Sequence, residues 1–99
     1  MSIESINPAT EEIIRNYEPM VWEQIESTIA AMQKTFLSWK ETSFTERSQK
    51  MKAAARILRD EIDEFARLMA DEMGNPVAQG KAEAEKCVWC CDYYADNAK

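Results

Sequence analysis

The sequence predicts a mainly α-helical fold, in which three amphipathic helices follow a short N-terminal β-hairpin. Between residues 21 and 98, apolar side chains recur three and four positions apart, which is the period of helices with one buried face. Before that region, a turn-forming Asn7-Pro8 pair precedes the β-branched pair Ile13-Ile14, which indicates a strand that follows a tight connection. We therefore expect residues 1–99 to form a single helical domain with short connections.

The hairpin is expected before the first helix. Pro8 restricts Asn7 to extended conformations, and we place the turn at residues 9–12. Ile13, Ile14 and Tyr17 supply the β-branched and aromatic residues that favour a strand. Because an isolated hairpin is marginally stable in water, we expect it to lie against another part of the protein.

Two long helices are expected in the middle of the chain. The first covers residues 21–40, and its apolar stripe consists of Trp22, Ile25, Ile29, Met32, Phe36 and Trp39. The second begins at Ser43, because Ser43 and Glu46 have the spacing of a capping box. It ends at Gly74, a natural C-terminal stop, and its stripe consists of Met51, Ala54, Leu58, Ile62, Phe65 and Met69.

A third helix is expected after Gly74, with Asn75 as its N-cap and Pro76 in its first turn. Its apolar face is predicted to consist of Val77, Gly80, Ala84, Cys87, Cys91, Tyr94 and Ala98. Val88 and Trp89 fall off this face, which leaves two interpretations open. Both residues form an exposed patch that contacts further protein, or both pack within the bundle.

Composition restricts the classes of partner. A net charge of -6 and a sequence pI of about 4.7 repel nucleic acid and anionic membranes, so neither is expected as a partner. No apolar run is long enough to span a bilayer, and the N-terminus lacks the pattern of a secretory signal. The three Cys residues are therefore expected to be thiols in a reducing cytoplasm.

Few residues qualify as catalytic or metal-binding candidates. The chain has no His, and its two Gly residues cannot form a Gly-rich phosphate loop. Cys87 and Cys90 have C-x-x-C spacing, but Cys87 is predicted well inside a helix, where the field of the helix N-terminus that activates redox pairs has decayed. With Cys91 they supply at most three thiolates, so a zinc site is not expected.

The charged residues are interpreted as surface. Lys81 and Lys86 are amines, but no neighbouring residue in the sequence would desolvate them into nucleophiles. Paired carboxylates such as Asp60-Glu61 and Asp71-Glu72 flank apolar stripe positions, as on a solvated helix face. The residue pattern alone thus predicts an acidic helical domain without a recognisable active site.

Several short segments of the sequence resemble segments that occur in the same order in the N-terminal region of the aldehyde dehydrogenase superfamily. Ile6-Asn7-Pro8-Ala9-Thr10 is similar to its opening hairpin, Trp39 to Arg47 to the join of its first two helices, and Glu72-Met73-Gly74-Asn75-Pro76 to its E-x-G-K-P turn. Glu85-Lys86-Cys87 and Asp92-Tyr93-Tyr94-Ala95 resemble the succinate-semialdehyde dehydrogenase branch. The resemblance extends over nearly the whole chain, yet it covers only the front of the family's polypeptide.

The resemblance implies a parent enzyme that oxidises aldehydes to acids with NAD or NADP. In the family a cysteine attacks the aldehyde, hydride passes to the nicotinamide, and a glutamate activates water. The resemblance places these residues, the oxyanion asparagine and the cofactor's Gly-rich turn beyond residue 99. None of the three cysteines matches the nucleophile, so no catalytic or cofactor-binding residue is carried onto this chain.

Two peripheral roles are implied as well. In some members a structural monovalent cation is held by backbone oxygens, and the matching positions are Ile6 and Glu72. The helix that bears Trp89 borders the substrate entrance in the family. Two residues depart from the family pattern: Glu11 stands where Gly is frequent, and Asn75 stands where Lys is usual. If the hairpin turn requires a positive φ, Glu11 strains it where Gly would not.

Two hypotheses about function follow. In the first, the chain is the N-terminal fragment of a succinate-semialdehyde-type dehydrogenase and is inactive alone, because it lacks the catalytic and cofactor sites. A truncated gene product would fit the two departures, and so would variation within the family. In the second, the chain is a non-catalytic interaction module, whose apolar helix surface is covered by self-association or by another protein chain.

Overall fold

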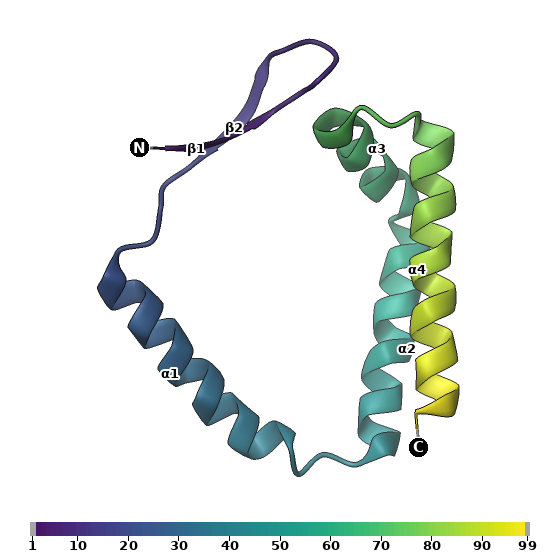
Figure 1. Ribbon diagram of the computed structural model, residues 1–99. Helices are drawn as coiled ribbons and strands as arrows, with labels where there is room; N and C mark the ends of the chain where they lie inside the picture. Colours follow the sequence, from purple (N-terminus) through teal and green to yellow (C-terminus); the bar gives the residue numbers. More distant parts are fainter. Residues whose placement is uncertain (1, 99) are drawn as a thin grey trace.

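The computed structural model describes residues 2–98 and confirms a mainly helical fold with an N-terminal hairpin. Strands β1 (Ile3–Ile6) and β2 (Ile13–Tyr17) precede four helices within this range, namely α1 (Trp22–Trp39), α2 (Phe44–Asp60), α3 (Ile62–Met73) and α4 (Val77–Asn97). The elements form an open, flat frame with principal extents of 46 × 40 × 16 Å (Figure 1).

The hairpin turn lies where the sequence predicted it. The two strands are antiparallel, with a register shift between Ser5 and Ile6. The side-chain oxygen Asn7 Oδ1 accepts hydrogen bonds from the amides of Ala9 and Thr10, at 2.9 and 3.2 Å. This Asx-type arrangement satisfies the turn's own backbone and explains why Asn stands at its start.

Glu11 adopts the left-handed conformation in this turn, with φ at 65°. Its amide donates to the carbonyl of Asn7 at 2.8 Å, so the conformation is held by the hydrogen bonding of the turn. A residue with a Cβ atom pays about 1–2 kcal/mol for this backbone geometry, whereas Gly does not. The strain expected from the departure at this position is therefore confirmed.

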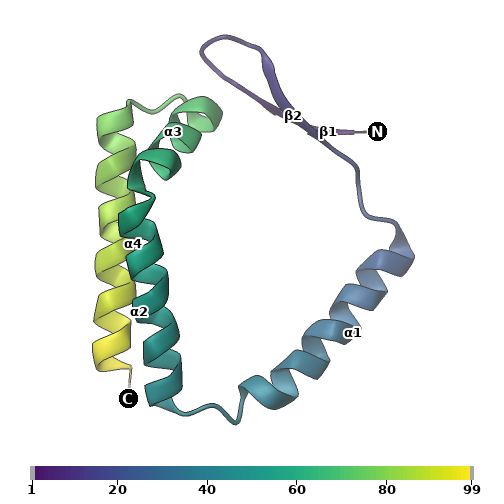
Figure 2. The same ribbon diagram turned by 180° about the vertical axis from the view of Figure 1, so that it is seen from behind.

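Helix α1 stands apart from the other helices as a separate limb of the frame (Figures 1 and 2). It begins after Val21, whose amide donates to Gln24 Oε1 at 3.0 Å. Within residues 22–39 no side chain is buried, so the expected packing of this helix into a bundle is wrong. The described part of the chain offers α1 no surface to pack against, although its apolar periodicity is intact.

The helix expected over residues 43–74 is divided in two at Glu61, where φ is -109° and ψ is 23°. No Gly or Pro marks the break. The bend lets Ala55 of α2 and Ala66 of α3 both become buried, since both helices pack on α4. The ends were predicted correctly: Ser43 Oγ accepts the amide of Glu46 at 3.1 Å, and Gly74 caps α3 with φ at 73°.

Helix α4 supplies the other half of this small core. Gly80, Ala84 and Val88 are buried, each four residues from the next. The predicted face was therefore partly wrong, since Cys87 is exposed and Tyr94 is 55% exposed. Close packing of helices along rows of residues four apart selects small side chains rather than the bulkiest ones. The predicted cap was also wrong, because Pro76 and not Asn75 occupies the N-cap position of α4.

Of the two interpretations of Val88 and Trp89, packing within the bundle holds for Val88 and exposure holds for Trp89. Val88 packs within the helices, while Trp89 is 67% exposed.

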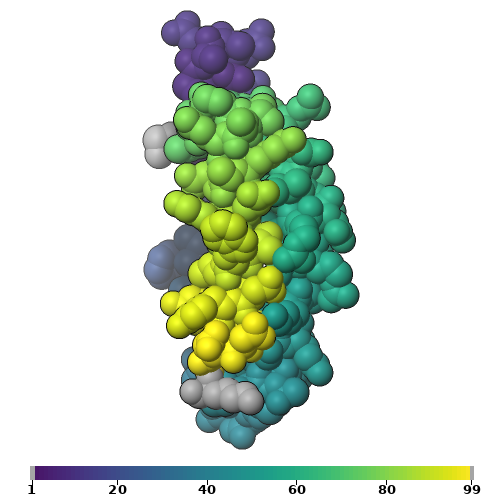
Figure 3. Space-filling view, turned by 90° about the vertical axis from the view of Figure 1, so that its right-hand side faces the viewer, coloured from purple at the N-terminus to yellow at the C-terminus, as the bar shows by residue number. Residues whose placement is uncertain are grey.

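Polar contacts reinforce the pairing of α2 with α4, which run side by side in Figure 3. Lys52 lies 3.1 Å from Asp96 and 3.5 Å from Asp92, both on α4.

Candidate functional site

The hairpin meets the C-terminal end of α3, which brings the two predicted cation-binding positions into one neighbourhood. Ser5 Oγ, adjacent to Ile6, donates a hydrogen bond to Glu72 Oε1 at 2.8 Å. A Cβ atom placed on Gly74 would lie 3.0 Å from Pro8 Cγ, so the turn rests directly on the glycine that ends α3. The hairpin thus lies against another element, as expected.

The backbone at Glu72 is chemically suited to a cation. Glu72 lies in the last turn of α3, where the carbonyl oxygens find no N–H donor within the helix. In residues 2–98, no hydrogen bond reaches its carbonyl oxygen. Among the same residues no group of three or more His, Cys, Asp or Glu side chains could hold a metal. The cation site at Ile6 and Glu72 stays a prediction, and it would need further oxygen ligands.

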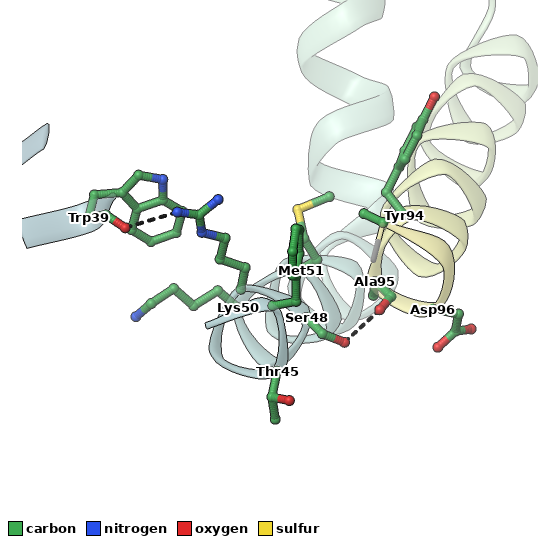
Figure 4. A pocket seen from close by; sticks show the side chains of 11 residues that line it. Trp39, Thr45, Ser48, Lys50, Met51, Tyr94, Ala95 and Asp96 are labelled. Carbon is green, nitrogen blue, oxygen red and sulfur yellow. Dashed lines mark hydrogen bonds between the residues drawn. The ribbon is translucent and has the colours of Figure 1, made fainter. Parts of the chain in front are cut away.

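A groove of about 610 Å³ lies where α1 ends, α2 begins and α4 ends (Figure 4). Trp39, Met51 and Tyr94 give it apolar walls, and Lys50 and Asp96 place opposite charges at its edges. It therefore has the character of a packing surface with a polar rim. The sequence did not predict it, because its walls come from three helices whose relative placement is a tertiary feature.

Arg47 uses its guanidinium to hold the joint between α1 and α2. Its Nε donates to Thr42 Oγ1 at 2.7 Å, and its Nη2 donates to the carbonyl of Trp39 at 3.1 Å. The guanidinium carbon also lies 5.2 Å from the centre of the Trp39 ring, within cation–π range. An arginine shortly after a helix end that satisfies its last carbonyls is a recognisable signal, which our reading of the sequence missed.

The hydroxyl of Ser48, which lines the groove, also makes a structural contact. Ser48 Oγ donates to the carbonyl of Ala95 at 2.7 Å, which ties α2 to α4 (Figure 4). The chain contains no His that could act as its general base. The Ser48 hydroxyl is therefore not paired with a histidine base.

The three thiols of this chain all lie on α4. Cys87 and Cys90 are exposed, Cys91 is half-buried, and all three are free. Helix α4 begins at Val77, so these residues lie far from its N-terminus, as expected. Of the lysines considered, Lys81 Nζ pairs with Asp63 at 2.9 Å and Lys86 is exposed.

Sequence comparison identifies the family: residues 1–99 match the aldehyde dehydrogenase family, and the chain belongs to it. It is 37% identical over 99 residues to succinate-semialdehyde dehydrogenase (NADP+) 1 of Mycobacterium tuberculosis (strain ATCC 25618 / H37Rv), covering all of this chain and 22% of the relative. It is 39% identical over 100 residues to the succinate-semialdehyde dehydrogenase (NADP+) of Mycobacterium avium (strain 104), covering 21% of that relative. The chain thus spans about a fifth of the length of these curated relatives.

Solved structures contain the same fold. Gox0499 superposes with a TM-score of 0.90 at 26% identity, over 99% of this chain and 22% of that one. The glyceraldehyde-3-phosphate dehydrogenase of Methanocaldococcus jannaschii DSM 2661, solved with NADP, superposes with a TM-score of 0.88 at 22% identity, over 94% and 20%. The open arrangement, with α1 apart, is therefore also found within longer chains. Within residues 2–98, no helix combines the length and apolarity that a membrane span requires.

Proposed function

We propose that this chain is the N-terminal helical part of an NAD(P)-dependent aldehyde dehydrogenase of the succinate-semialdehyde type. The supporting observation is the match of all 99 residues to succinate-semialdehyde dehydrogenases at 37–39% identity. The match includes the hairpin, the α1–α2 joint and the Gly74 turn, and each of these has a definite structural role. The substrate class comes from the relatives alone.

We further propose that the chain does not oxidise aldehydes by itself. The chemistry of the family requires a cysteine with an oxyanion donor, a general base and a dinucleotide-binding turn. Here Cys87, Cys90 and Cys91 lie within one helix, and two Gly residues cannot form the turn. The residues present therefore do not fit NAD or NADP, and we assign no step of the reaction to them.

The proposed contribution of the chain is structural. The carbonyls of Ile6 and Glu72 would contribute to a monovalent-cation site of the complete enzyme, supported by the Ser5–Glu72 hydrogen bond at 2.8 Å. Trp89 would border the substrate entrance, supported by its exposure on α4. A cytoplasmic location is proposed on the basis of the three free thiols.

The test compares the isolated chain with a chimera. In the chimera, residues 1–99 replace the aligned residues of the M. tuberculosis relative, and NADP-dependent oxidation of succinate semialdehyde is measured. We expect no turnover from the isolated chain and clear turnover from the chimera, with the unmodified relative as control. Turnover by the isolated chain would contradict the proposal that it does not oxidise aldehydes by itself. A folded chimera without activity would contradict the assignment to this enzyme type.

A second candidate, a non-catalytic interaction module, is favoured by one observation. Helix α1 keeps an apolar stripe but buries none of its residues. If the chain functions by self-association, sedimentation should show dimers or larger species at micromolar concentration. A strict monomer throughout would count against self-association.

A further inference from the structure

The cysteines of α4 take no part in the proposed function. All three thiols are free, and those of Cys87 and Cys90 are exposed. Cysteine is usually retained for its reactivity or its metal binding rather than for its packing. Thiolates are soft ligands that select soft cations, so two free thiols on one surface of a helix are a candidate metal site.

Cys87 and Cys90 stand on the same exposed side of α4. They are three residues apart within one continuous helix, which places them about 60° apart around its axis. Val88, which is buried against the neighbouring helices, lies about 100° from Cys87 and about 160° from Cys90. Both thiols therefore lie away from the packed face of the helix.

The spacing of the two side chains is too wide for a disulfide and suited to a bridging cation. Residues three apart on a helix hold their Cβ atoms about 5–6 Å apart, whereas a disulfide needs about 3.5–4.5 Å. A two-coordinate cation holds its two sulfurs in line. They are then about 4.6 Å apart, because a metal–thiolate bond is about 2.3 Å long. Two sulfurs that extend side by side from a helix reach this separation without any change of its backbone.

We propose that Cys87 and Cys90 form a two-coordinate binding site for the soft monovalent cation Cu(I). Each thiol releases its proton to solvent as its sulfur binds, so one Cu(I) and two thiols give a bis-thiolate complex and two protons. No electron is transferred in this step. The ligands all belong to α4, so the site is independent of the proposed function.

Cys91 is not a ligand of this site. It is half-buried, and it follows the buried Val88 by three residues, which turns it toward the packed side of α4. Among residues 2–98, no three His, Cys, Asp or Glu side chains are grouped so that they could hold a metal ion. A structural zinc ion takes four ligands and does not fit two thiolates, whereas two-coordinate Cu(I) does.

The experiment titrates the reduced chain with Cu(I) under argon, in competition with the chelator bathocuproine disulfonate. We expect the chain to bind one Cu(I). X-ray absorption at the copper edge should find two sulfur neighbours. Circular dichroism should show the same helix content with and without copper, because the two thiols already have the required spacing on the helix.

Three serine variants test the choice of ligands. Cys87→Ser and Cys90→Ser each leave one thiolate of the pair, and we expect each to weaken Cu(I) binding at least about 100-fold, since the second thiolate binds intramolecularly. Cys91→Ser is the matched control, because it removes the neighbouring thiol, and it should change the affinity less than about threefold. Cys87 and Cys90 are exposed, so their replacement should leave the fold intact.

The alternative outcomes each contradict the proposal. Wild-type affinity in Cys87→Ser or in Cys90→Ser would show that the pair does not hold the cation. A loss in Cys91→Ser as large as that in Cys90→Ser, or three sulfur neighbours at the copper, would show a different ligand set. Sedimentation that finds a dimer only when copper is present would show a cation shared between two copies, which would also overturn the site within one helix.

Discussion

Gly80 of α4 lies directly against the backbone of Ala66 in α3. A Cβ atom on Gly80 would stand 3.0 Å from Ala66 Cα and 3.1 Å from the Ala66 carbonyl oxygen. Both are backbone atoms, so they cannot rotate out of the way as the end of a side chain would. The two helices therefore touch backbone to backbone at this point, and any side chain on residue 80 would require them to separate by a few tenths of an ångström.

Gly80→Ala should therefore destabilise the chain. Alanine favours a helix by about 1 kcal/mol over glycine, but the forced separation of α3 from α4 costs more. We expect a net loss of about 1–3 kcal/mol in the free energy of unfolding. Urea unfolding followed by circular dichroism measures this loss. Gln79→Ala, on the exposed side of α4, is the control with little expected change. An equal or higher stability of Gly80→Ala would contradict the close approach.

Glu11→Gly should stabilise the hairpin turn by about 1 kcal/mol, because glycine adopts a φ of 65° without steric cost. The amides of Asn7 and Glu11 close this turn. In the variant, both should exchange hydrogen about fivefold more slowly. Glu12→Gly is the matched control, since Glu12 has no positive φ and should gain nothing. Equal exchange in the two variants would mean that the turn carries no strain.

Arg47→Lys should loosen the joint between α1 and α2 while keeping the charge. Lysine lacks the planar fork that reaches Thr42 and the carbonyl of Trp39 together. We expect the last turn of α1 to lose about 1 kcal/mol of local stability. Faster hydrogen exchange at the amides of Lys40 and Thr42 would report this loss. Arg56→Lys, at an exposed position of α2, should leave these amides unchanged.

The pairing of α2 with α4 should weaken at alkaline pH. The hydrogen bond to Asp96, together with the charges of Asp96 and Asp92, raises the pKa of Lys52 above its usual value of 10.5. A group whose pKa is raised by folding stabilises the folded state. This stabilisation is fully present below the pKa of the unfolded state, and it is lost as the pH rises through the pKa of the folded state.

The thermal midpoint should accordingly fall more steeply above about pH 10.5 in the wild-type chain than in Lys52→Met. Lys52 is exposed, so the difference should be small and reduced by salt. Lys50→Met is the control, because it also removes a lysine but leaves the contacts of Lys52 with Asp92 and Asp96 intact. Parallel pH profiles for all three proteins would show that the cluster does not contribute to stability.

Features set by neighbouring residues could be predicted from the sequence. Asn7-Pro8 defines the hairpin turn, Ser43 begins α2, and Gly74 ends α3, because each acts through its own backbone or that of the next few residues. The strain at Glu11 was expected only on the condition that the turn has a positive φ at this position, and the family resemblance rather than the local pattern pointed to it.

Tertiary features could not be predicted in this way. The break at Glu61 has no local signal and follows from the packing of α2 and α3 on one helix. Periodicity correctly placed Ala84 on the buried face but also favoured Cys87 and Tyr94 as core. Close approach of the helices selected Val88 instead. Periodicity likewise identified the apolar stripe of α1 without revealing that residues 2–98 hold no surface to cover it.

In the candidate site, too, the tertiary features could not be predicted from the local sequence. The adjacency of Ile6 and Glu72 was implied only by the family resemblance, because these residues are 66 positions apart in the sequence. The groove beside Trp39 depends on how three helices meet, and no local pattern encodes that meeting.

The unusual backbone at Glu11 has a genetic consequence. Both glutamate codons, GAA and GAG, become glycine codons when the middle adenine is replaced by guanine. Relief of the turn is therefore a single transition away for any gene that encodes this chain. Random mutagenesis followed by selection for heat-resistant clones should recover that transition repeatedly and independently.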